Sequence, residues 1–337
     1  MLKGILRRHA VNTKTSLYGL LLFATIFACG CNRHASAPQM THAASHADAP
    51  AEQSSKQPDS AATSPSLKRT DLMRAVFPGW RDTRQGKERI FDADVPDRDD
   101  GGHLAKNFGS ERLDIRPREV IRLDDTHAVM LTEGVEIGDD DTPVDSHSSG
   151  AWLGAYFFRL DGGRWTLERR IDGTDYAGFM GTYGQSRVVR LSPREFGLLL
   201  ESGSCWQGYC GSWLNIYDLA PGRVDKLADG IRTAASNLGG KEECEKILKR
   251  DGDFLASKFA PHGESTGGSP QCFDVDSQIS VIPGINGPGD VTLSFSGSAT
   301  ATNNSSTQVK SVDGVAVYRI ENGRYQLVEG SNPVPSF

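Results

Sequence analysis

Residues 158–167 read Phe158-Arg159-Leu160-Asp161-Gly162-Gly163-Arg164-Trp165-Thr166-Leu167, with apolar and polar residues alternating on both sides of a glycine-containing turn. Alternation with a period of two is typical of a half-buried β-strand. Glycine reaches positive φ at little cost, so Asp-Gly-Gly suits a tight turn between two strands. The segment therefore predicts a β-hairpin, and the rest of the fold follows from its repetition.

Two further copies of this hairpin occur along the chain. The clearer one is 318–327, with Glu321-Asn322-Gly323 at the turn, and the weaker one is 217–227, with Ala220-Pro221-Gly222. Each copy is preceded by a second alternating pair, at 120–134, 188–201 and 279–295. The pattern predicts three units, each of which is a four-stranded antiparallel meander.

The predicted fold class is all-β. One meander cannot bury its apolar face alone, so the three units must stack as sandwiched sheets or close around an axis like propeller blades. A propeller usually has at least four blades, so that alternative needs a degenerate unit near 75–116. A short charged helix at 241–250 is expected inside an insertion at 231–277.

The N-terminal segment has the pattern of a targeting signal. Four basic residues precede an apolar run at 16–28 that is too short to span a bilayer easily, and Ala28-Cys29-Gly30-Cys31 follows. This resembles a bacterial lipoprotein precursor, in which a small residue precedes the cysteine that receives the lipid. The resemblance covers about the first tenth of the chain. It implies export, cleavage after residue 28 and a lipid-anchored N-terminus.

Either of two cysteines could carry the lipid. Cys29 fits the pattern of the lipoprotein signal better, with Ile26 three residues before it, whereas choosing Cys31 leaves an even number of cysteines for disulfides. We favour Cys29 and keep Cys31 as the alternative. No Asp follows either cysteine directly, and in lipoproteins of this kind that implies an outer-membrane location, with the domain on the periplasmic side.

A tether and one folded domain are expected after the signal. Residues 29–69 are rich in Ala, Ser, Pro and His and have almost no large apolar residue, so they are predicted to be a disordered tether with a span of roughly 35 Å. The all-β domain is expected at 70–337. The chain has 37 basic and 43 acidic residues, a net charge of −6, and loss of the four basic residues of the signal leaves −10. This balance argues against nucleic acid and anionic membrane surfaces as partners.

The remaining four cysteines predict a disulfide framework, because cysteines of exported proteins are usually paired. Pairing between neighbours in the sequence gives Cys205–Cys210 and Cys244–Cys272. The first pair would constrain a loop that contains Trp206 and Tyr209, with Trp213 beside it. Rigid aromatic side chains recur in recognition sites because ordering them costs little entropy. We therefore name these three as candidate binding residues and add Tyr176, Phe179 and Tyr183 from the Gly-rich segment 173–185.

The sequence contains no convincing catalytic motif. Residues 263–267 match G-x-S-x-G, but Pro261 and Pro270 flank it where a strand and a helix are needed. Glu133 and Glu201 occupy similar places in their units and are the only acid pair that we consider. The acidic stretches 92–103 and 139–147 do not have the spacing of a calcium loop. We expect no metal, no cofactor and no catalytic residue.

These observations favour a non-enzymatic binding module in the bacterial envelope, with an unidentified protein or glycan as its partner. One alternative is an envelope hydrolase that acts on glycan or peptide and uses carboxylates such as Glu133 and Glu201 as acid and base. The other is an inhibitor or immunity protein that blocks a cationic enzyme through its acidic loops.

Overall fold

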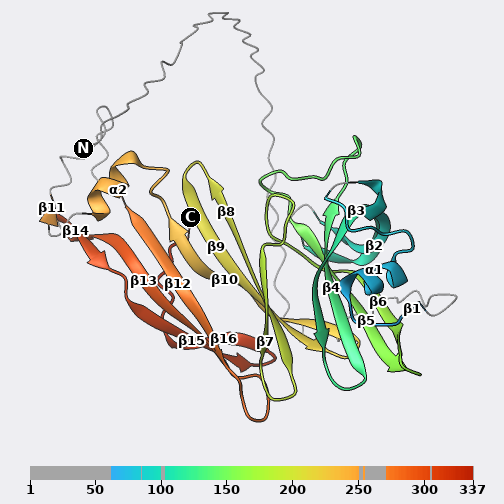
Figure 1. Ribbon diagram of the computed structural model, residues 1–337. Coiled ribbons are helices and arrows are strands. Elements are labelled where there is room, and N and C mark those ends of the chain that lie inside the picture. Colours follow the sequence, from blue (N-terminus) through green and yellow to red (C-terminus); the bar gives the residue numbers. More distant parts are fainter. Residues whose placement is uncertain are drawn as a thin grey trace, which may run out of the picture. The chain divides into compact units, whose positions relative to one another are not determined.

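The structure is a computed structural model, and it describes residues 62–84, 86–99, 103–249, 253–254, 271–303 and 306–336 (Figure 1). The signal segment, both lipidation candidates (Cys29 and Cys31) and the G-x-S-x-G match lie outside these residues. None of the helices in the described part of the chain has the length and apolar character needed to cross a membrane.

The predicted all-β fold with a short helical insertion is confirmed. The described elements form two antiparallel sheets, with six strands in the order β1-β6-β5-β4-β3-β2 and ten strands in the order β11-β14-β13-β12-β10-β9-β8-β7, where β15 joins β13 and β16 joins β15. The strands are β1 (Thr63–Ser64), β2 (Ile90–Arg98), β3 (Leu104–Arg122), β4 (His127–Glu136), β5 (Ala151–Asp161), β6 (Arg164–Ala177), β7 (Gln185–Arg190), β8 (Phe196–Trp206), β9 (Tyr209–Ala220), β10 (Arg223–Ser236), β11 (Asp253–Phe254), β12 (Phe273–Ile282), β13 (Asp290–Asn303), β14 (Ser306–Ser311), β15 (Gly314–Glu321) and β16 (Arg324–Gly330). The helices are α1 (Arg69–Val76), the 3-10 helix η1 (Lys87–Arg89) and α2 (Glu242–Leu248).

The repeated hairpin forms as its turn chemistry predicts. Asp161 pairs with Arg164 across a two-residue turn in which Gly162 and Gly163 have φ of 55° and 78°. The last copy has the same geometry, with Asn322 and Gly323 at 53° and 79°. Two successive positive φ values characterise the type I′ turn, which matches the twist of paired strands.

The three predicted meanders are β3–β6, β7–β10 and the series β12, β13, β15, β16, in which each strand pairs with the next. They are not propeller blades. Ala235 of β10 pairs with Val275 of β12, so the second and third meanders belong to one sheet. The segment 75–116, which was the candidate for a degenerate fourth unit, instead contains the last residues of α1, η1, β2 and the first part of β3.

The central strands β4, β5, β8 and β9 are buried on both faces over much of their length. In β4, Ala128 and Met130 belong to a first hydrophobic core, whereas Val129 and Leu131 belong to a second core that includes residues of both sheets. Leu198 of β8 lies in that second core, and its neighbour Leu199 lies in a third core within the larger sheet. Strands covered on both faces read as continuous apolar runs, which explains Leu198-Leu199-Leu200.

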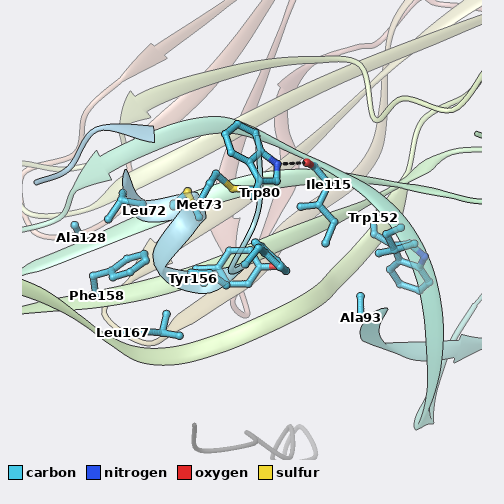
Figure 2. Packing of buried hydrophobic residues seen from close by; sticks show 14 of the residues in the cluster. Leu72, Met73, Trp80, Ala93, Ile115, Ala128, Trp152, Tyr156, Phe158 and Leu167 are labelled. Carbon is cyan, nitrogen blue, oxygen red and sulfur yellow. Dashed lines mark hydrogen bonds between the residues drawn. The ribbon is translucent and has the colours of Figure 1, made fainter. Parts of the chain in front are cut away.

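Helix α1 covers the outer face of the six-stranded sheet and completes the first core. Leu72 and Met73 of the helix are fully buried, and Trp80 follows after the turn at Pro78-Gly79. Figure 2 shows the Trp80 indole among these side chains, with its Nε1 donating a hydrogen bond to the carbonyl oxygen of Ile115 at 3.1 Å. This bond ties the segment after α1 to β3.

Two predicted boundaries differ from the observed elements. Thr63–Ser64 forms β1 and pairs with Trp165 and Thr166, so this end of the expected tether is part of the fold. A two-residue strand has no period to detect, which is why the sequence pattern missed it. The connection expected at 231–277 is shorter, because β10 continues to Ser236 and β12 begins at Phe273.

Both predicted disulfides are confirmed. Cys205 and Cys210 pair directly across β8 and β9, with their Cα atoms 4.0 Å apart. Cys244 of α2 is bonded to Cys272, which directly precedes β12, with a Cα–Cα distance of 5.2 Å. Both Cys244 and Cys272 are fully buried, so this second bridge anchors α2 to the larger sheet.

Candidate aromatic binding surface

The β8–β9 hairpin ends in the exposed Trp206, opposite Tyr209, and this tip is the centre of the candidate site. The intervening Gln207 and Gly208 have φ of 49° and 80°, which is again a type I′ turn. A Cβ atom at Gly208 would lie only 2.0 Å from the backbone carbon of Gly239. Only glycine allows this approach, so the tip is fixed against the turn that follows β10.

Two loops from elsewhere in the chain meet this hairpin. His147 lies edge-on to Trp206, with 5.2 Å between ring centroids, and Phe179 contacts Trp213 with 5.5 Å between centroids. Trp206 is 61% exposed and Met180, next to Phe179, is 47% exposed. We call the set Trp206, Trp213, Phe179, Met180 and His147 the aromatic patch. Tyr209 is not part of it, because this side chain is half-buried and packs against the third core.

The loops of the aromatic patch are held together by their backbones. The amide of Met180 donates to the carbonyl oxygen of Ser146 at 3.2 Å, and the amide of Gly181 donates to that of Ser149 at 2.8 Å. Met180 has a φ of 55°, an uncommon value for a residue with a side chain. The loop is therefore built to present Met180 outward rather than being an irregular connection.

Glu133 of β4 anchors the loop that carries Phe179 and Met180. Its buried carboxylate accepts hydrogen bonds from Thr182 Oγ1 at 2.7 Å and from the amide of Tyr183 at 3.1 Å. Arg118 Nη1 lies 3.3 Å from this carboxylate, and Arg118 Nη2 donates to the carbonyl oxygen of Gly184 at 2.7 Å. The six-stranded sheet thus fixes the segment that carries Phe179 and Met180.

Besides Tyr209, two of the six predicted binding residues lie elsewhere. Tyr183 is fully buried in the second core with the Arg118 guanidinium 4.9 Å from its ring, and burial raises the pKa of its phenol. Tyr176 packs on Trp152, and its hydroxyl accepts a hydrogen bond from the amide of Gly150 at 2.9 Å. We therefore exclude Tyr183 from the candidate surface and assign Tyr176 to the packing around β5.

Sequence reasoning missed His147 and Met180. His147 lies in the acidic stretch 139–147, and nothing in the local sequence marks it as a neighbour of Trp206. Met180 follows Phe179 directly, but a single methionine in a Gly-rich segment does not indicate a surface. Only a prediction of contacts between loops could have found them.

Both members of the acid pair considered for catalysis are engaged in hydrogen bonds. Glu133 is engaged by an arginine and two hydrogen-bond donors, whereas Glu201 accepts a hydrogen bond from Thr233 Oγ1 at 2.7 Å. In the acidic loop, Asp141 is paired with Arg112 and Lys87. Within the described ranges, no group of three or more His, Cys, Asp or Glu side chains is arranged to hold a metal ion.

A second polar cluster surrounds Asp175 of β6, beside a cavity of about 420 Å³. Its carboxylate accepts a hydrogen bond from the hydroxyl of Tyr217 and lies 2.6 Å from Lys226 Nζ. Burial, and then the charge of Asp175, raise the pKa of Tyr217 well above 10. A phenol in this state donates a hydrogen bond but is not a nucleophile at neutral pH, so we assign the cluster a structural role.

Comparison with known proteins leaves the site to be interpreted from its own geometry. No family model matches the chain, and neither a curated protein nor a solved structure matches it significantly. The aromatic patch is the feature of the described chain on which a function can be argued.

Removal of the Cys205–Cys210 disulfide is expected to have a moderate effect. The bridge closes a loop of only a few residues, so the double change Cys205→Ser and Cys210→Ser should lower the free energy of unfolding by about 2 kcal/mol or less. The turn and the strand pairs around it remain. Urea denaturation measures the change. A loss of cooperative unfolding would contradict the view that the backbone pairing of β8 with β9 holds the hairpin together.

Proposed function

We propose that this protein is an envelope lipoprotein whose folded domain acts as a non-enzymatic binding module through the aromatic patch. The observation that carries the proposal is the convergence of the β8–β9 tip with loops at 143–149 and 178–182 on one group of aromatic side chains around the exposed Trp206. Surfaces of this kind are typical of recognition sites, because tryptophan and tyrosine contribute large contact areas at low entropic cost.

Several features support export and anchoring. The two disulfides suit an oxidising compartment such as the bacterial periplasm. The N-terminal segment, with Cys29 or Cys31 as the lipid acceptor, would attach the domain to the outer membrane through its tether. We place the domain on the periplasmic side, where a partner protein or a glycan would meet the aromatic patch.

The rigidity of the aromatic patch also favours binding. A surface that is ordered before it meets its partner loses less conformational entropy on association. Gly208 is locked against Gly239, and Glu133 fixes the loop that presents Phe179 and Met180. Both features fix the positions of the exposed side chains Trp206 and Met180 before a partner binds.

The change Trp206→Ala tests this proposal. We expect affinity for the partner to fall about 10-fold to 100-fold, as at an interface hot spot, because the indole is 61% exposed at the centre of the candidate site. The melting temperature should change little, because exposed substitutions usually alter stability by within about 0.5 kcal/mol. The measurement is capture of the partner from the native membrane after brief crosslinking, together with a thermal melt.

The matched control is Ile285→Ala. Ile285 is 88% exposed and lies on the β12–β13 connection. Its replacement therefore also removes exposed apolar surface but leaves the aromatic patch intact. Equal loss of capture in both variants would contradict a specific role for Trp206. A large fall in the melting temperature of Trp206→Ala would show that the indole supports the fold.

A further inference from the structure

The segments that form the aromatic patch are strongly unbalanced in charge. Four aspartates occur at 139–145, whereas 178–184 and 204–213 have no charged residue and the turn at 237–241 contributes only Lys241. Lys241 Nζ lies 3.4 Å from the carbonyl oxygen of Gln271. The loop that carries His147 thus also carries four carboxylates, whereas the other segments of the patch contribute a single positive charge.

Two of these aspartates are available to a partner. Asp141 is paired with Arg112 and Lys87, and Asp140 accepts hydrogen bonds from Thr142 within its own turn. Asp139 and Asp145 are exposed, and among the described residues neither forms an ion pair. Their negative charge is therefore not neutralised by the protein itself.

Asp145 is held beside the aromatic patch. The Cα of Asp145 lies 3.3 Å from the position that a Cβ would take at Gly181, next to Met180. Ser146 accepts the hydrogen bond from the amide of Met180, and His147 contacts the indole of Trp206. One short segment thus carries both a free carboxylate and a ring of the patch.

We propose that the partner binds the aromatic patch through a cationic, arginine-rich segment. A guanidinium stacks well on an indole and is more weakly hydrated than an ammonium ion, so Trp206 and a nearby carboxylate together suit arginine better than lysine. The net charge of −10 after loss of the signal would steer such a partner toward the protein. This inference rests on the proposed function and names the chemistry of the partner.

Defined probes test the inference. The full chain is titrated with a fluorescent peptide of alternating Arg and Gly, with a matched peptide of Glu and Gly, and with an oligomer of N-acetylglucosamine. We expect binding of the Arg-Gly peptide alone, and its affinity should fall steeply between about 0.05 M and 0.5 M NaCl, because charges are screened over about 10 Å at 0.1 M. Trp206→Ala should weaken this binding at least about tenfold.

A pair of charge-matched variants separates the aromatic patch from the overall charge. Asp139→Asn with Asp145→Asn should reduce the affinity about threefold to tenfold. Asp161→Asn with Glu329→Gln removes the same charge from exposed positions on β5 and β16 and should change it less than about twofold. Equal effects of the two pairs, or absence of Arg-Gly binding, would overturn the inference.

The outcome also distinguishes this inference from the proposed function. If the glycan oligomer binds in place of the cationic peptide and depends on Trp206, the cationic partner is wrong and the binding module stands. If no probe binds and capture from the membrane is unaffected by Trp206→Ala, both fail.

Discussion

Replacement of Trp80 by alanine is expected to lower the free energy of unfolding by about 3–5 kcal/mol. Trp80 is 1% exposed and packs with Leu72, Met73 and Tyr156 in the core between α1 and the six-stranded sheet (Figure 2). The change removes one of the largest buried side chains and leaves a cavity that a sheet and a helix cannot easily close. Denaturation in urea measures the loss.

Trp80→Phe is the matched control. Phenylalanine keeps much of the buried area but cannot donate the hydrogen bond that Trp80 Nε1 makes to Ile115. The expected cost is therefore smaller, about 1–2 kcal/mol. If Trp80→Ala had the same free energy of unfolding as the wild type, the assignment of α1 and the turn after it to the first core would be wrong.

Replacement of Glu133 by alanine is expected to destabilise the protein by about 3 kcal/mol and to weaken binding at the aromatic patch. Removing one member of a buried ion pair typically costs about 3–5 kcal/mol, and the lower end applies because the Arg118 side chain is 29% exposed and can reach water. The amide of Tyr183 and the hydroxyl of Thr182 also lose their acceptor. The loop with Phe179 and Met180 should open more often, which hydrogen exchange of residues 178–184 measures.

Glu201→Ala serves as the comparison, because Glu201 is half-buried and accepts a hydrogen bond from a single side chain, that of Thr233. It should cost about 1 kcal/mol and leave the exchange of 178–184 unchanged. An unchanged exchange rate in Glu133→Ala would contradict the anchoring of the loop by β4.

Much of the fold was predictable because its signals are local. The turns Gly162-Gly163 and Asn322-Gly323 specify type I′ hairpins within a few residues, and alternation on both sides gives the strand faces. The pairing of Cys205 with Cys210 follows in the same way from their short separation. These local signals do not specify how one meander joins the next. The pairing of Ala235 in β10 with Val275 in β12, which unites two meanders in one sheet, depends on contacts between segments separated by a long connection.

The candidate site was predictable in part. Trp206 and Trp213 could be found because a disulfide loop with aromatic residues is a recognisable combination. His147 could not, because its contact with Trp206 joins loops about sixty residues apart. Tyr183 resembled a surface aromatic in its Gly-rich segment, but the carboxylate of Glu133 binds its backbone amide and its ring lies in the core.

Site-specific photo-crosslinking tests the central claim most directly. A photoreactive phenylalanine analogue would be placed at position 206 and, in a second variant, at position 285, which is also highly exposed. The account predicts that irradiation of cells joins a defined partner to position 206 and not to position 285. Crosslinks of equal yield and identity at both positions, or none at 206 with the protein folded in the membrane, would contradict the assignment of the aromatic patch as the binding surface.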